Sequence, residues 1–173
     1  MGIAAFAGAM LSALAGIGGG ILLLGVLAQF FPPVLAIPIQ GSIQLVANGS
    51  RAAFLATEIS WDVVWRTSIL ILPASFLGVA VATSIPTDAT RLMLGLFVLV
   101  AAWRPIRRPA DAGREVSAAT LVGVGAMSGL LNTTVGASGP ATAPFLKAAT
   151  VSHAAFVATS AATQVGAHGA KIL

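Results

Sequence analysis

The sequence lacks cysteine and has very few charged residues. Only 8% of its 173 residues are Asp, Glu, Lys or Arg, whereas a soluble domain carries about 25%. The absence of cysteine excludes disulfides, thiolate catalysis and cysteine-ligated metal sites. The shortage of charge, with 57% hydrophobic residues and a mean hydropathy of +0.97, indicates a membrane protein.

Acidic side chains are missing from every segment that we expect to cross the membrane. The five in the chain all fall in predicted connections: Glu58, Asp62, Asp88, Asp111 and Glu115. This distribution argues against a carboxylate proton relay and leaves His168 as the one plausible titrating group inside the membrane. The chain also has no ATP-binding loop, so this chain does not itself drive transport with ATP.

The hydrophobic runs predict an all-α, polytopic transmembrane helical bundle. A spanning helix needs roughly 20 mostly apolar residues. The predicted spans are 3–31 (interrupted at 16–20), 34–54, 63–84, 92–103, 117–149 (interrupted at 136–140) and 151–173. Pro32 and Pro33 end the first span, because proline cannot donate a helical hydrogen bond. Thr87 or Asp88 is the expected N-cap of the fourth.

One short stretch is clearly hydrophilic and divides the chain. Residues 104–116 contain four of the nine basic residues and two prolines, which predicts a linker between transmembrane repeats at 1–103 and 117–173. The positive-inside rule places this basic linker in the cytoplasm. Counting spans then puts Arg51 and Lys171 at cytoplasmic ends as well. The predicted location is the bacterial cytoplasmic membrane, crossed several times.

The two halves share a pattern with an offset of 120 residues. It pairs Gly16 with Gly136, Gly19 with Gly139, Gln44 with Gln164 and Arg51 with Lys171. The pattern predicts two repeats of about four spans, the second incomplete, each with a glycine-broken first helix. Corresponding interrupted helices in two halves are a sequence pointer to a transporter's binding site.

The glycine breaks favour an anion. Each glycine inside a helix costs roughly 1 kcal/mol relative to alanine, and unwound backbone is tolerated at membrane depth only where it is buried or lines a polar cavity. The freed amides and the positive end of a half-helix attract negative charge. The alternative is that the glycines serve close helix packing. The predicted cradle consists of Gly16, Gly18, Gly19, Gly20, Gly136, Ser138 and Gly139.

Polar side chains at helical spacings are the second set of candidates. Gln44 and Asn48 are i and i+4 neighbours, as are Gln164 and His168, so each pair shares a helix face. We expect these four to line the solute path, with hydrogen-bonding between helices as the alternative. Ser42 and Ser160 are the predicted hydroxyl donors, and Arg51 and Lys171 the predicted cytoplasmic mouth or topology anchors.

A different class of function has a partial signature. The stretch 136–139 matches the G-x-S-G motif of rhomboid intramembrane proteases, with Ser138 as nucleophile and His168 as base. Only 30 residues separate the two, however, which is room for one span, and the usual upstream histidine is missing because the first histidine is His153. We therefore expect no enzyme activity and no catalytic residue. A non-transporting scaffold is the third alternative.

The first repeat resembles the sulfite exporter TauE/SafE-like permeases. The resemblance lies in the run 15–20, in Ser42-x-Gln44-x-x-x-Asn48-x-x-Arg51, in the connection 58–61 and in the short fourth helix before a basic loop. It implies a membrane permease for sulfite, organosulfur compounds or carboxylates, built from two four-helix repeats. It also implies that a counterpart of 54–103 is missing after Leu173, so we expect a fragment, with a shortened gene and a six-span version as the alternatives.

The predicted partners follow from this assignment. They are the lipid bilayer and a small anionic solute, with no nucleic acid and with homo-oligomerisation left open. No cofactor and no metal are expected. The sequence gives neither the anion nor the direction of transport nor the coupling ion.

Overall fold

The computed structural model describes residues 19–103 and 115–172, and these are entirely α-helical apart from turns and one short 3-10 helix. The predicted all-α fold is thus confirmed. The elements are α2 (Gly19–Phe30), α3 (Pro33–Phe54), η1 (Ala56–Glu58), α4 (Trp61–Ser68), α5 (Ile71–Ser84), α6 (Thr87–Trp103), α7 (Ala118–Thr134), α8 (Gly139–Ala148) and α9 (His153–Gly169). Gly16, Gly18 and most of the predicted linker 104–116 lie outside the described residues.

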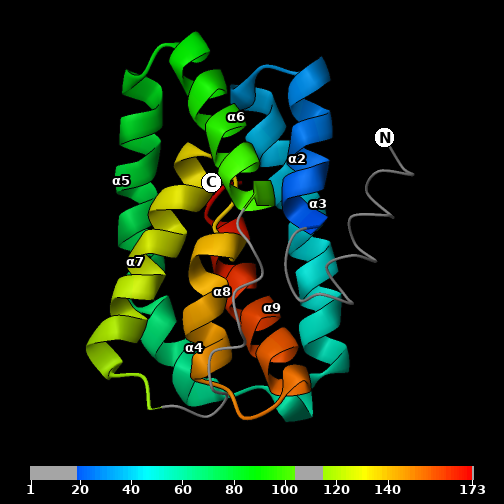
Figure 1. Ribbon diagram of the computed structural model, residues 1–173, viewed down its shortest axis with the longest axis vertical. Helices are drawn as coiled ribbons and strands as arrows, with labels where there is room; N and C mark the ends of the chain where they lie inside the picture. The colour runs from blue at the N-terminus through cyan, green and yellow to red at the C-terminus, as the bar shows by residue number, and fades with distance from the viewer. Residues whose placement is uncertain (1–18, 104–114, 173) are drawn as a thin grey trace.

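The helices run mostly along the long axis of the molecule (Figure 1). The two most extensive contacts join elements that are distant in sequence: α5 packs along α7, and α3 packs along α9. The C-terminal turn after α9 lies inside the bundle rather than at an end of it (Figure 1). The contact between α3 and α9 places the polar faces of the two predicted repeats side by side.

Prolines and serines set the helix starts. Pro33 begins α3 directly after α2 has ended at Phe30, as the Pro32–Pro33 pair predicts. Ser117 and Ser152 are the N-caps of α7 and α9, and each accepts a backbone N–H three residues on. The predicted N-cap at Thr87 or Asp88 is wrong, because α6 already begins at Thr87 and both residues lie in its first turn.

The starts of α3 and α9 reproduce the sequence offset. α3 begins at Pro33 and α9 at His153, which are 120 residues apart. α2 is described from Gly19 onward, and α8 begins at Gly139. The described part of the second half contains counterparts of α2 and α3, and the repeat organisation as a whole stays a prediction.

The predicted span 63–84 is wrong as a single helix, because it is bent by 40° between α4 and α5. Pro73 explains the break: it has no N–H for the carbonyl of Ile69, four residues before it, and its ring would collide with that carbonyl. Among the described residues, no single helix is long and apolar enough to cross a membrane by itself. The bent pair α4–α5 meets that criterion when its two parts are taken together.

Glycines allow α7 to approach α4 and α5 at backbone distance. A Cβ at Gly125 would collide with the backbone of Thr67, and one at Gly129 would collide with the carbonyl of Ile71 and lie 3.0 Å from the Ser75 nitrogen. Gly78 of α5 is equally close to α7, because a Cβ there would collide with the Thr133 hydroxyl and lie 2.9 Å from the Leu130 carbonyl oxygen. The spacing of Gly125 and Gly129 is the G-x-x-x-G arrangement typical of close helix pairs in membranes.

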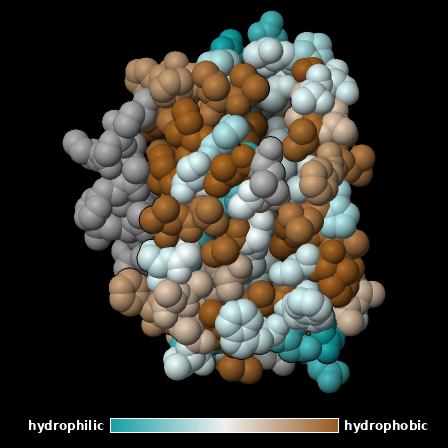
Figure 2. Space-filling model, turned by 180° about the vertical axis from the view of Figure 1, so that it is seen from behind, coloured by the Kyte–Doolittle hydropathy of each residue, from teal (hydrophilic) through white to brown (hydrophobic). Residues whose placement is uncertain are grey.

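An apolar core joins the N-terminal helices to the interruption between α7 and α8. Leu23, Leu24 and Leu27 of α2 are buried against Ala36 and Ile37 of α3, and the cluster includes Ala137 from the interruption. Outside, large apolar side chains are exposed, among them Phe54 (89% exposed) and Val151 (80%). Figure 2 shows apolar residues over most of one face, with the most hydrophilic ones at its two ends. Such a surface suits a lipid environment.

A candidate solute-binding site between the two halves

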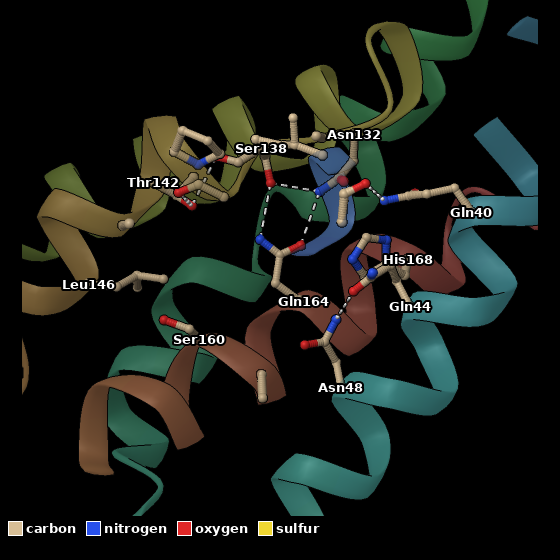
Figure 3. A pocket seen from close by; sticks show the side chains of 17 residues that line it. Gln40, Gln44, Asn48, Asn132, Ser138, Thr142, Leu146, Ser160, Gln164 and His168 are labelled. Atoms are coloured by element: carbon tan, nitrogen blue, oxygen red, sulfur yellow. Dashed lines mark hydrogen bonds between the residues drawn. The ribbon is translucent and has the colours of Figure 1, made fainter. Parts of the chain in front are cut away.

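A small polar pocket lies where α3, α7, α8 and α9 converge (Figure 3). Its cavity measures about 50 Å³, whereas one water molecule needs roughly 10–15 Å³. It therefore has room for a few water molecules or one compact ion. The polar residues of its wall are Gln40, Gln44, Asn48, Asn132, Ser138, Thr142, Ser160, Gln164 and His168.

Two helices contribute matched triplets to this wall. Gln40, Gln44 and Asn48 are spaced four apart on α3, and Ser160, Gln164 and His168 are spaced four apart on α9. Four-residue steps keep side chains on one helix face. The six residues form three pairs with the offset of 120. The four residues predicted to line the solute path thus do meet at one pocket.

Ser138 is the centre of a hydrogen-bond network. Its Oγ accepts from Asn132 Nδ2 at 2.7 Å and from Gln164 Nε2 at 3.2 Å, and it lies 2.9 Å from Ser128 Oγ (Figure 3). Asn132 Nδ2 is also 3.3 Å from Gln164 Oε1. Two accepted bonds use both lone pairs of the hydroxyl. The Ser138 proton is therefore donated to Ser128, and the network ties α7 and α9 to the interruption.

Most carboxamide oxygens around the pocket are already bound by donors. Lys171 Nζ donates to Gln40 Oε1 at 2.7 Å. Asn48 donates to Gln44 Oε1, and Arg51 donates to Asn48 Oδ1 at 2.9 Å. With Gln164 Oε1 held by Asn132, four acceptors are engaged. Occupied acceptors reduce the negative potential of the wall, which favours a negatively charged solute.

Lys171 is buried beside this site and is not a residue of an exposed mouth, so the predicted placement is corrected. It is 7% exposed, and its second bond runs to the carbonyl of Gly136 at 2.6 Å. The methylene stem of Lys171 packs against Gly41, because a Cβ added at Gly41 would lie 3.1 Å from the Lys171 Cβ and Cδ atoms. No carboxylate forms an ion pair with it among the described residues. A buried cation held only by neutral acceptors favours an anion nearby.

Three buried polar atoms have no hydrogen-bond partner within the described part of the chain: Asn132 Oδ1, Ser160 Oγ and His168 Nδ1. All three belong to residues of the pocket wall, and these residues are 0%, 8% and 5% exposed. Unpartnered buried polar groups are costly and rare in folded proteins. All three atoms lie at one small cavity, so water or a polar ligand in that cavity is what would satisfy them.

The second glycine break has a different shape from the one that the sequence suggested. The interruption covers 135–138, and Gly139 and Pro140 already belong to the first turn of α8. From the predicted cradle of this break, Ser138 and Gly139 line the pocket. Pro140 lies beside them but has no N–H to offer a ligand. Gly136 does not line the pocket; its carbonyl holds Lys171 instead.

The remaining predicted residues divide between the pocket and its surroundings. Gly20 lines the pocket, and its carbonyl accepts from Gln40 Nε2 at 3.2 Å, whereas Gly19 is not part of the wall. Ser42 does not line it either: it is exposed, and its hydroxyl donates to the Pro38 carbonyl of its own helix. Residues two apart on a helix face different directions, so Ser42 cannot share the face of Gln44.

The proteolytic alternative finds no support in this geometry. No hydrogen bond joins Ser138 to His168 in the described part of the chain, because the Ser138 hydroxyl is engaged with Ser128, Asn132 and Gln164. A serine nucleophile needs an adjacent base to take its proton. Nor do the described residues contain a group of three or more metal-ligating side chains.

Gly136 has φ = +79°, the left-handed region that favours glycine. We expect Gly136→Ala to lower the free energy of unfolding by more than the roughly 1–2 kcal/mol of left-handed backbone strain, because the new Cβ would also lie 2.6 Å from Leu24 Cδ2. Thermal unfolding in detergent measures this. Gly166→Ala, with nothing within 4 Å, is the control, and equal stability of the two variants would contradict the expectation.

Several wall residues are absent from the site that the sequence predicts. Gln40 is one helical turn before Gln44 on the face already chosen, so the four-residue spacing contained that signal. Asn132 is the only amide in the apolar helix α7, but its link to Ser138 depends on the turn between α7 and α8. No pattern in the sequence predicts Thr142 as a residue of the pocket wall.

The bundle, its apolar surface and its polar pocket define a helical membrane protein with a candidate small-solute site. Comparison with known families specifies it further. The family model "Sulfite exporter TauE/SafE" matches residues 1–172, and the chain belongs to this family. It is accordingly a membrane transporter of sulfite or related anions and not an enzyme. No curated protein and no solved structure matches the chain.

Proposed function

We propose that this protein is a permease of the bacterial cytoplasmic membrane that moves small anions, such as sulfite, small organosulfur compounds or carboxylates. The pocket between α3, α7, α8 and α9 is the proposed binding site along the path. The observation that carries this proposal is the set of three unpartnered buried polar atoms around one cavity beside the buried Lys171.

The charges of the site support an anion. The wall contains no Asp or Glu, and the α8 N-terminus at Gly139 contributes the positive end of a helix dipole. Lys171 adds a full charge one hydrogen bond away, through Gln40. With a cavity of about 50 Å³, the site suits a compact anion in this conformation.

The matched wall residues from α3 and α9 support the proposed two-repeat organisation, with repeats at 1–103 and 117–173. In many transporters the solute site lies near the bilayer midplane at the interface between two repeats. We propose the same arrangement here, with the 104–116 loop on the cytoplasmic side.

Anion flux tests the proposal. The full chain is reconstituted in liposomes, and movement of sulfite, thiosulfate, small sulfonates and small carboxylates is measured against protein-free liposomes. We expect flux of at least one of them. Folded protein that moves none would contradict the permease.

Ser160→Ala tests the location of the site. The Ser160 hydroxyl has no partner among the described residues, so its loss removes a ligand contact without breaking an internal bond. We expect anion affinity to fall about tenfold, since a hydrogen bond to a charged group is worth roughly 1.5–3 kcal/mol, while thermal stability is unchanged. Ser42→Ala is the matched control, because Ser42 is exposed outside the pocket. Equal anion affinity in both variants would place the site elsewhere.

A further inference from the structure

Asn132 presents the one wall carboxamide oxygen that remains without a partner. The corresponding oxygens of Gln40, Gln44, Asn48 and Gln164 each accept a hydrogen bond. Asn132 Oδ1 accepts none within the described residues, although Asn132 is 0% exposed. An otherwise donor-rich wall thus contains a single open carboxamide acceptor.

The surrounding hydrogen bonds favour the orientation of the Asn132 amide that the structure shows. In the present orientation, each contact to Ser138 and Gln164 joins a donor to an acceptor. Turning Asn132 alone would set its oxygen against Gln164 Oε1, and turning Gln164 alone would set two NH₂ groups against each other. Turning both would leave two carboxamide oxygens near Ser138 Oγ, which has one proton for them. The open atom is therefore the oxygen.

An open acceptor selects what binds beside it. A fully deprotonated oxyanion has only acceptors and would leave Asn132 Oδ1 buried and unsatisfied, which is unfavourable. An oxyanion that keeps an O–H can donate to this oxygen while its other oxygens accept from the wall. The Ser160 hydroxyl can donate, and His168 Nδ1 can do either according to its tautomer, so neither decides the question.

We propose that Asn132 is a specificity-determining residue that makes the pocket prefer oxyanions bearing a hydroxyl proton over deprotonated oxyanions of equal charge and shape. This proposal rests on the proposed function, since it assumes that the pocket between α3, α7, α8 and α9 is the anion site.

Two pairs of matched anions test the preference. Hydrogencarbonate and nitrate are planar monoanions, and hydrogenphosphate and sulfate are tetrahedral dianions; in each pair only the first has an O–H. The concentration that gives half-maximal thermal stabilisation of the purified full chain is measured for all four and for sulfite. We expect the O–H member of a pair to bind at least about tenfold more tightly, the size of one satisfied hydrogen bond.

The variants are Asn132→Ala and, as matched control on the same helix, Thr134→Ala; Thr134 is buried but does not line the pocket. We expect Asn132→Ala to reduce the preference to near one by weakening the O–H member of each pair more than its partner, and Thr134→Ala to keep the preference. A merely structural role for Asn132 would weaken both members of a pair equally.

The outcomes separate the two proposals. If nitrate and sulfate bind to the wild-type protein as tightly as their partners, the role of Asn132 is wrong and the anion site stands. If neither sulfite nor any of the four anions binds to folded protein, the anion site itself is wrong, and the role of Asn132 falls with it. Should Asn132→Ala fail to fold, the wild-type preference alone decides.

Discussion

Gly129→Ala is expected to prevent the protein from folding to a stable bundle. The new methyl group would overlap the Ile71 carbonyl and lie 3.0 Å from the backbone nitrogen of Ser75. Overpacking of flexible side chains costs roughly 1–3 kcal/mol. Here the obstructing atoms belong to the backbone of α5, so relief requires α7 and α5 to move apart along their whole contact. We expect the free energy of unfolding to fall by about 3 kcal/mol or more.

The matched control for this variant lies on the same helix. Gly123 of α7 has nothing within 4 Å of the position of a Cβ, so Gly123→Ala adds helix propensity without a collision. We expect that control to be as stable as the wild type or slightly more stable. Size-exclusion profiles and thermal unfolding in detergent compare the two variants. Wild-type stability of Gly129→Ala would show that α5 and α7 are not in contact at this position.

Local sequence rules predicted those parts of the fold that local chemistry determines. Pro32 and Pro33 separated α2 from α3, and Ser117 began the second half, because a missing N–H and a capping hydroxyl act within a few residues. The bend between α4 and α5 was missed although Pro73 signals it, since the apolar run 63–84 is continuous on either side.

The candidate site was predictable to the extent that it follows helical periodicity. Gln44, Asn48, Gln164 and His168 were found because four-residue steps place them on single faces. Gln40 continues the same four-residue spacing, but its contact with Lys171, like the contact of Asn132 with Gln164, depends on how distant elements pack. Such contacts bridge 32 and 131 residues of sequence, and no local pattern encodes them.

The burial of Lys171 changes what the second repeat contributes to the site. From sequence, a basic residue after a span indicates a topology anchor, because lysines commonly extend to the membrane interface. In the structure the ammonium instead connects the Gly136 carbonyl of the interruption to Gln40 of the pocket wall. Lys171 thereby links the interruption and the pocket, and its amino group lies one hydrogen bond from the wall through Gln40.

Lys171→Met is therefore expected to weaken anion binding about 30-fold in protein that remains folded. A unit charge that acts on the anion through one intervening side chain contributes about 2 kcal/mol at an effective dielectric constant of about 20. Methionine preserves much of the stem that packs on Gly41, and removing a buried charge also removes its desolvation cost.

Lys147→Met is the matched control, because Lys147 is a half-buried residue near the end of α8 that is not part of the pocket wall. Anion titrations followed by thermal stabilisation measure affinity and stability together. If Lys171→Met lowers stability but leaves the affinity of the folded protein unchanged, Lys171 is a structural clamp and the positive potential of the site comes from α8 and from Arg51 beside Asn48.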